Sequence, residues 1–272
     1  MHRSTFHSVL AVGFLLFASS GFASVQKNVL TVEASQLTDA MRATAMPQLD
    51  NSRVGGILNR YYNEGLGGAE NWEQIGSLRV AGVLTLESGE FSFTSMKKKP
   101  DLTRMVIHAP GRRRDLMLGY DGTIAWIRNP HEDGGPQSME DAAARRFIHT
   151  AHFGSHLLYP FAKGKNIAYI DTVPLAGRIC HHLQVTLDTG FIVDYYIDIR
   201  THLEVRVVST DTYTGDASTV MYDDYTFDYD IPIARKITNH ENGEWVSTLV
   251  LQDVKLNTGL MPWMFKMPEK KR

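Results

Sequence analysis

The chain has 272 residues, of which 43% are hydrophobic and 21% are charged, and its formal net charge at pH 7 is −2. This length allows one or two domains, and the composition is that of a globular protein rather than a disordered chain. The slight negative charge argues against a nucleic-acid-binding protein. Cys180 is the single cysteine, which excludes an intrachain disulfide and a multi-cysteine metal site.

Residues 1–23 have the features of a cleavable secretory signal peptide. Arg3 supplies the positive start, an apolar run extends from Val9 to Phe17, and Gly21 and Ala23 provide the small residues of a cleavage site. A membrane anchor is the alternative, but the run is shorter than the ~20 residues that span a bilayer. We therefore expect export, with cleavage after Ala23.

We expect residues 24–49 to form a poorly ordered leader or to contain a short helix. From Asn51 onward apolar residues recur at spacings of three and four, which places them on one face of a helix. The glycine-rich segment 65–68 is expected to end this helix, because glycine readily adopts the left-handed conformation of helix ends. The apolar residues concerned are Val54, Ile57, Leu58 and Tyr61.

Beyond residue 73, apolar and polar residues alternate, as they do in strands with one buried face. The alternation is clearest from Phe191 to Asp198 and from Leu203 to Thr210, and a polar turn at 198–201 joins these runs into a hairpin. The pair Asp121–Gly122 is a strong signal for a tight turn. The pattern predicts about ten antiparallel strands.

One further helix interrupts the strands, and we predict it at Gln137–Phe153. The alanine-rich segment Ala142–Arg146 favours helix, and Ser138 followed by Asp141 resembles a capping arrangement. Gly154 is expected to end the helix.

A sheet with this many strands must curl or close, because twist accumulates and open edges are hazardous. Two helices cannot cover both of its faces. The predicted fold is therefore mainly β (α+β): a strongly curved antiparallel sheet that forms an incomplete barrel, with a helical lid on its concave side. Residues 50–268 would form this single domain, and residues 269–272 a basic tail.

Five motifs in this order resemble the LolA/LolB-like superfamily, in its branch of outer-membrane lipoprotein-sorting proteins. Each motif is weak alone, and their order and spacing carry the resemblance, which covers roughly residues 50 to 268. The motifs are Gly65–Gly68 with Trp72–Ile75 and Gly82, Gly119–Trp126, the helix after Ser138, Tyr195–Asp198 with Thr201–Leu203, and Leu256–Asn257 with Phe265 and Pro268.

The resemblance implies a periplasmic protein whose helices cover a hydrophobic cavity for acyl chains. It does not identify the cargo, and no ligand-retaining residue of the family can be matched to a position here. Five aromatic residues are candidates for lining the cavity, although a large aromatic side chain fills a core as readily as it lines a pocket. They are Phe91, Phe93, Trp126, Tyr195 and Tyr229.

Two basic clusters fall in turns of the predicted sheet and could form one patch for anionic head groups or an acidic partner. Solvated turns are the alternative interpretation. The clusters are Lys97, Lys98 and Lys99, and Arg112, Arg113 and Arg114.

The sequence gives little support for a metal or catalytic site. His149, His152 and His156 have helical spacing, but no nearby carboxylate or cysteine obviously completes a metal site, so we expect a polar edge of the lid. Asp223, Asp224, Asp228 and Asp230 alternate along one strand instead of converging across a cleft. Gly-x-Ser-x-Gly, His-Glu-x-x-His and phosphate-binding glycine motifs are absent from the sequence.

We therefore expect a carrier or chaperone that binds a lipid or lipoprotein acyl chain without a cofactor, a metal or catalysis. Each buried methylene contributes about 0.8 kcal/mol, so a tail can be held without a sharp polar motif. An envelope transporter or another membrane protein would be a further partner, and nucleic acid would not. A sensor or accessory module that binds an envelope protein is the alternative function, and a hydrolase with an unrecognised site is a weaker one.

Overall fold

The computed structural model describes residues 52–108, 115–130, 135–158 and 164–269. Within these ranges 13 strands form one antiparallel sheet in the order β6-β5-β4-β3-β2-β1-β13-β12-β11-β10-β9-β8-β7. Consecutive strands pair with each other except β6 and β7, and the pairing of β1 with β13 joins the two halves of the chain. The strands are β1 (Ser77–Leu86), β2 (Gly89–Lys98), β3 (Leu102–His108), β4 (Leu116–Tyr120), β5 (Ala125–Arg128), β6 (Gln137–Ser138), β7 (Lys165–Leu175), β8 (Arg178–Leu187), β9 (Phe191–Asp198), β10 (Glu204–Asp211), β11 (Ala217–Asp228), β12 (Ile231–Glu241) and β13 (Glu244–Leu256).

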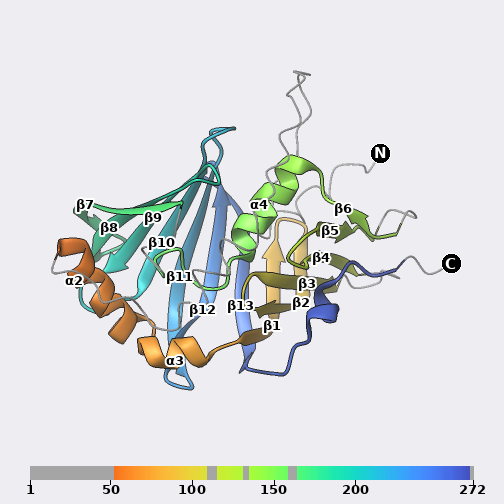
Figure 1. Ribbon diagram of the computed structural model, residues 1–272, viewed down its shortest axis with the longest axis horizontal. Coiled ribbons are helices and arrows are strands. Elements are labelled where there is room, and N and C mark those ends of the chain that lie inside the picture. Colours follow the sequence, from red (N-terminus) through yellow and green to blue (C-terminus); the bar gives the residue numbers. More distant parts are fainter. Residues whose placement is uncertain (1–51, 109–114, 131–134, 159–163, 270–272) are drawn as a thin grey trace.

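The sheet curves strongly but does not close, because β6 and β7 lie at its two ends and do not pair with each other. Figure 1 shows helix α4 between the two halves of this sheet. The predicted incomplete barrel is thus confirmed, with 13 strands instead of about ten.

Local turn chemistry sets several of the hairpins. The carboxylate of Asp121 accepts hydrogen bonds from the backbone N–H groups of Thr123 and Ile124 at 2.9 and 2.8 Å, which fixes the tight turn predicted before β5. Asn242 and Gly243 both have positive φ, at 49° and 89°, as the two-residue turn between β12 and β13 requires.

Helices cover the concave face at two places. Helix α2 (Arg53–Arg60) continues as the π-helical turn η2 (Tyr61–Gly65), and both pack on β8, β9 and β10. Helix α4 (Asp141–Ala151) packs through Phe147 and Ala151 on β4 and β5. The short elements α3 (Ala69–Gln74) and η3 (Pro262–Phe265) complete the fold.

The predicted boundaries of α4 were wrong at its start. Gln137 and Ser138 form the edge strand β6, and the residue that precedes the helix is Glu140, whose side chain makes no capping hydrogen bond. Tertiary pairing with β5 therefore overrides the capping pattern at Ser138. Helix α3 was not predicted, because six residues are too short for a helical period to be recognised. The predicted signal peptide and the leader at 24–49 lie outside the described residues.

The segment that contains α2 and η2 offers a stability test with an internal control. A Cβ atom on Gly65 would lie 2.0 Å from the carbonyl oxygen of His202, and neither backbone can move away easily. We expect Gly65→Ala to lower the free energy of unfolding by about 1–3 kcal/mol, as overpacking does. Gly56 has open space at its Cβ position, so Gly56→Ala should raise stability by about 0.5–1 kcal/mol through helix propensity.

Urea unfolding of the two glycine variants checks this prediction. Equal effects of the two substitutions would show that the approach of η2 to His202 does not constrain the fold.

Candidate functional site

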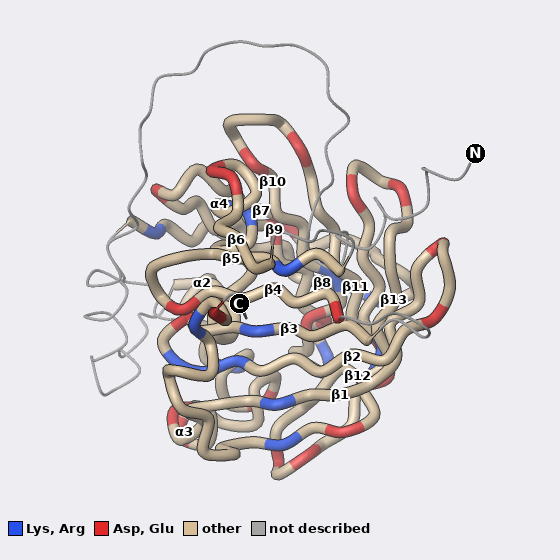
Figure 2. Tube along the Cα trace, turned by 90° about the vertical axis from the view of Figure 1, so that its right-hand side faces the viewer, with Lys and Arg blue, Asp and Glu red and all other residues tan. Residues whose placement is uncertain are grey.

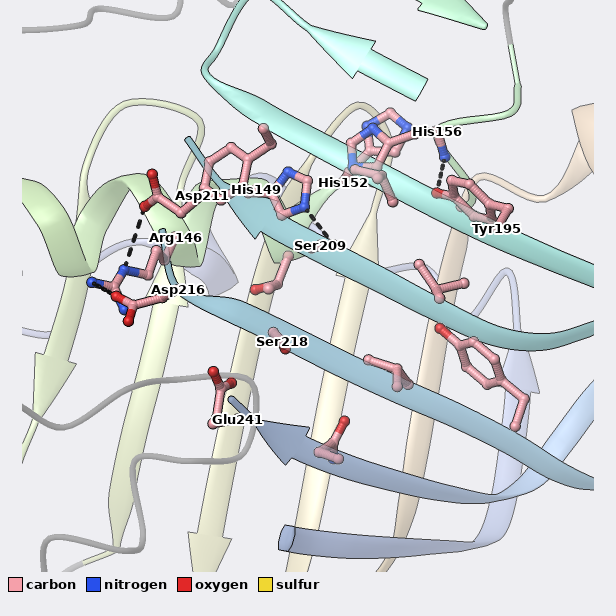
Figure 3. A pocket seen from close by; sticks show the side chains of 18 of the residues that line it. Arg146, His149, His152, His156, Tyr195, Ser209, Asp211, Asp216, Ser218 and Glu241 are labelled. Carbon is pink, nitrogen blue, oxygen red and sulfur yellow. Dashed lines mark hydrogen bonds and ion pairs between the residues drawn. The ribbon is translucent and has the colours of Figure 1, made fainter. Parts of the chain in front are cut away.

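A cavity of about 210 Å³ lies between α4 and the concave face of β9 to β12. It occupies the space between the two regions that the helices fill with apolar core: α2 with β8–β10, and α4 with β4 and β5. Figure 3 shows Arg146, Asp211, Asp216 and Glu241 at one end of the cavity and His156 and Tyr195 at the other.

The floor of the cavity is apolar in its middle. Tyr195 of β9 pairs with Val207 of β10, and Val207 pairs with Val220 of β11, so that these three side chains form one row across the sheet. Val193 and Tyr222 extend the apolar surface on either side of this row.

The floor becomes polar toward the hairpin between β10 and β11. The next row across the sheet brings Ser209, Ser218 and Glu241 together, because Ser209 pairs with Ser218 and Ser218 with Glu241. Asp211 and Asp216 lie at the hairpin itself. The cavity is therefore amphipathic, with an apolar floor and a polar rim.

Ion pairs join α4 to this rim. Arg145 and Asp211 form a close ion pair, and the Asp211 side chain is only 2% exposed. Arg146 lies 3.7 Å from Asp211 and 3.3 Å from Asp216. The Asp211 carboxylate also accepts a hydrogen bond from the Tyr213 backbone N–H, so one buried carboxylate orders both the hairpin and the lid.

Three histidines line the cavity beneath the lid and stack on one another. The ring centroids of His149 and His156 are 4.8 Å apart, and those of His152 and His156 are 4.3 Å apart. His149 also stacks on Phe191 at 4.0 Å and lies 3.1 Å from the Ser209 hydroxyl. Burial lowers the pKa of His149 to about 3 and holds that of His156 well below 6.5, so both rings are neutral at pH 7.

Lys97 holds the C-terminal end of α4. Its ammonium group donates hydrogen bonds to the carbonyl oxygens of Thr150 at 2.8 Å and His152 at 3.2 Å, and burial lowers its pKa to about 8. Behind it, His152 Nδ1 lies 3.2 Å from the Asp101 carboxylate. His152 Nε2 is buried and has no hydrogen-bond partner among the described residues.

Glu241 is the carboxylate of the polar rim whose protonation is most affected by its surroundings. Burial raises its pKa to about 7. A hydrogen bond from Ser218 and the positive charge of Arg146 act in the opposite direction but are smaller effects. Because its pKa is higher in the folded chain, stability falls as the pH rises from 4.5 through 7. We expect Glu241→Gln to remove this dependence and to stabilise the protein at pH 8 by about 1 kcal/mol, since partial exposure screens the full effect.

The control is Glu244→Gln, which changes the exposed residue that pairs with Glu241 across the β12–β13 hairpin. Urea unfolding at pH 5 and pH 8 checks the prediction. It fails if Glu241→Gln keeps the pH dependence of the wild-type protein.

The five aromatic residues that the sequence suggested are not brought together. Tyr195 lines the cavity, and its hydroxyl accepts a hydrogen bond from the His156 backbone N–H at 2.9 Å. Phe91 and Phe93 pack in the apolar cluster of β1 to β4, and Tyr229 is 70% exposed beside the β11–β12 turn. Trp126 is fully buried and donates a hydrogen bond to the carbonyl of Phe265 at 2.8 Å. A ligand-binding role for these four stays a prediction, and the proposals below use Tyr195 alone.

The lysine cluster is partly structural. Lys97 holds the end of α4, and Lys99 donates to the carbonyls of Trp72 and Glu73 at the end of α3. Cations at helix C-termini interact favourably with the helix dipole. Lys98 makes no such contact within the described chain, and Arg112, Arg113 and Arg114 lie outside the described residues. Figure 2 shows other basic residues spread along β1 to β3, so a joint head-group patch stays a prediction.

Sequence reasoning missed the polar groups on the concave face. Glu204 was expected on the solvent face of β10, but an irregular register between Glu204 and Arg206 turns its carboxylate inward. There it accepts a hydrogen bond from the Tyr61 hydroxyl at 2.5 Å, and burial raises its pKa. Strand alternation alone gave no signal for this β-bulge.

The described residues contain neither a side-chain cluster suited to a metal ion nor a helix suited to crossing a membrane. No group of three or more His, Cys, Asp or Glu side chains in this part of the chain is arranged to hold a metal ion. Within the same residues, no helix has the length and apolar character that crossing a membrane requires.

No protein-family model and no curated protein matches the chain. Among solved structures, a DUF1329 family protein from Desulfovibrio piger is similar with a TM-score of 0.58 at 10% identity, over 79% of this chain and 98% of the other. A LolA superfamily protein from Nitrosomonas europaea is similar with a TM-score of 0.52 at 13% identity, over 78% of this chain and 96% of the other. The chain has a LolA/LolB-like fold. This confirms the predicted resemblance for the fold, and identities this low carry nothing further about ligands.

Within the LolA/LolB-like fold, the cavity lies on the concave side of the sheet beneath a helical lid, where the sequence predicted it. Its lining is more polar than predicted, because Ser209, Ser218 and Glu241 face inward beside the apolar row.

Proposed function

We propose that the protein is a carrier or chaperone that binds a lipid or lipoprotein acyl chain on the concave side of its sheet. The observation that carries this proposal is the apolar row of Tyr195, Val207 and Val220, which faces an open space beneath α4. Tyr195 and Val207 also border the apolar core beneath α2, and Val220 extends the row beyond that core along the cavity.

The size of the cavity indicates how the chain would enter. A cavity of about 150 Å³ can already bind benzene, whereas pockets for whole drug-sized ligands usually exceed about 300 Å³. The volume of about 210 Å³ therefore accepts part of an acyl chain. A complete chain requires α4 to move away from the sheet.

The arrangement of side chains favours binding over catalysis. The Asp101–His152 pair is oriented like a general base, but no nucleophile of the described residues lies within hydrogen-bond distance of His152 Nε2. Apolar contact supplies binding energy without chemistry, at about 0.8 kcal/mol for each buried methylene.

Lipid extraction and a filled cavity test the proposal together. Organic extraction and mass spectrometry of the purified protein should detect a co-purified acyl lipid. Val220→Phe, which fills the apolar row, should weaken the binding of a fluorescent acyl probe about tenfold. The control is Met221→Phe, because Met221 lies on the opposite face of the same strand and pairs with Arg206. If neither lipid nor probe binds, or if the two variants behave alike, the proposal fails.

We further propose that residues 1–23 direct export to the periplasm, where an envelope transporter or another membrane protein would exchange the acyl chain. The signal-like sequence supports this proposal. Mass spectrometry of the intact protein from the periplasmic fraction should give a chain that begins at Ser24. An uncleaved chain in the cytoplasmic fraction would contradict it.

A further inference from the structure

At the end of the cavity beneath the C-terminus of α4, two nitrogen atoms have hydrogen-bonding capacity that the described residues leave unfilled. They are Lys97 Nζ and His152 Nε2. Lys97 has three ammonium hydrogens, and two of them are directed to the carbonyl oxygens of Thr150 and His152. His152 is 8% exposed, and its buried Nε2 has no partner among the described residues. Both side chains line the cavity. Because buried polar atoms are nearly always hydrogen-bonded, this pair of atoms calls for an external partner.

The charges around this end favour an anion. Lys97 is partly buried without an ion-pair partner in the described chain, and the Asp101 carboxylate, whose charge acts on Lys97, already accepts a hydrogen bond from the Phe153 backbone N–H at 3.0 Å and lies 3.2 Å from His152 Nδ1. The positive charges of Lys97 and Lys165 add to burial in lowering the pKa of His156. The buried ammonium therefore gains a stabilising interaction when an anion enters.

Asp101 prepares His152 for the same ligand. The Asp101 carboxylate orients the His152 ring through Nδ1 and leaves Nε2 as the ring nitrogen for a ligand. Lys97 and His152 would then each donate to one oxygen of a two-oxygen group. At the opposite end, Asp211 and Asp216 form ion pairs with Arg145 and Arg146, so the charges of these side chains are matched there.

We propose that Lys97 and His152, with Asp101 behind His152, bind the carboxylate group of a fatty acid whose tail lies on the apolar row of β9 to β11. The inference rests on the proposed function, because the tail occupies the same cavity. It adds the chemical class of the ligand: a single-chain amphiphile with an anionic head.

Calorimetric titration of the delipidated full chain with dodecanoate and with dodecan-1-ol at pH 7 tests the proposal. The two ligands share a tail and differ in the charge of the head group. The wild-type protein should bind dodecanoate at least tenfold more tightly. Lys97→Gln should remove this preference, and Lys98→Gln should keep it, because Lys98 is the next residue of β2 and faces the other side of the sheet.

A second variant is needed because Lys97→Gln also removes the hydrogen bonds to the end of α4 and so affects folding as well as binding. His152→Phe keeps the ring that stacks on His156 and removes Nε2, and it should lower the preference for dodecanoate severalfold. Equal affinities of the wild-type protein for the two ligands would overturn the carboxylate site and leave acyl binding intact. Binding of neither ligand would overturn the proposed function itself.

Discussion

Replacing Asp211 with asparagine is expected to lower the free energy of unfolding by about 3 kcal/mol, because it leaves the buried guanidinium group of Arg145 without its counter-charge. The Asp211 side chain is 2% exposed and that of Arg145 is 16% exposed, so water cannot replace the lost partner. Asparagine keeps a side-chain oxygen for the Tyr213 backbone N–H, which limits the change to the charge. Urea unfolding at pH 7 measures the effect.

The neighbouring ion pair provides the control for this prediction. Asp216 is 31% exposed and pairs with Arg146 at 3.3 Å, so Asp216→Asn should cost less than about 1 kcal/mol. The double variant Asp211→Asn/Arg145→Met should recover part of the loss, because it removes the unpaired charge as well. If Asp211→Asn is as mild as Asp216→Asn, the Arg145–Asp211 pair does not hold the lid.

These contacts also bear on the proposed function, in which α4 would have to move to admit a whole acyl chain. The helix is held near its middle by the ion pairs of Arg145 and Arg146 and at its C-terminal end by Lys97. The Lys97 contact is hydrogen bonding to carbonyl oxygens, and the proposed anionic ligand would compete for the same ammonium group. The two sets of contacts are therefore of different kinds, and the proposed ligand would act on only one of them.

The sequence was sufficient for the fold because its strand signals are local. Alternation from Phe191 to Asp198 and the Asp121–Gly122 turn depend on neighbouring residues, and both appear in the structure as predicted. The pairing of β1 with β13 is not local, and no pattern in the sequence indicated it.

The site was less predictable because small shifts decide which side chains face inward. The irregular register in β10 moves Glu204 to the interior, and a stretch of β10 and β11 presents Ser209 and Ser218 beside valines. Trp126 was expected in the cavity but is buried against the C-terminal segment, where Gly119 leaves room for its ring: a Cβ there would lie 2.3 Å from the indole. Such contacts arise between residues distant in sequence, which periodicity does not report.

Acidification is expected to destabilise the protein through His149. The pKa of His149 is lowered from 6.5 to about 3 in the folded chain, chiefly by burial, so the unfolded chain binds more protons between these values. Stability therefore falls as the pH falls below 6.5, by about 1.4 kcal/mol for each pH unit. Between pH 6.5 and pH 4.5 this single residue should cost about 2 kcal/mol.

His149→Gln isolates this contribution, because glutamine does not titrate and can still bond to the Ser209 hydroxyl. The difference between the free energies of unfolding at pH 7 and pH 4.5 should be about 2 kcal/mol smaller in the variant than in the wild-type protein. Glu241 contributes equally to both proteins and cancels in this comparison, whereas His156 adds a small difference because His149 helps to lower its pKa. His108→Gln is the control, because the His108 side chain is 48% exposed and is paired with Asp115 outside the cavity. An unchanged pH dependence in His149→Gln would mean that this ring is hydrated in solution, and the cavity beneath α4 would then be open to water at the point where the proposed acyl chain would have to be shielded from it.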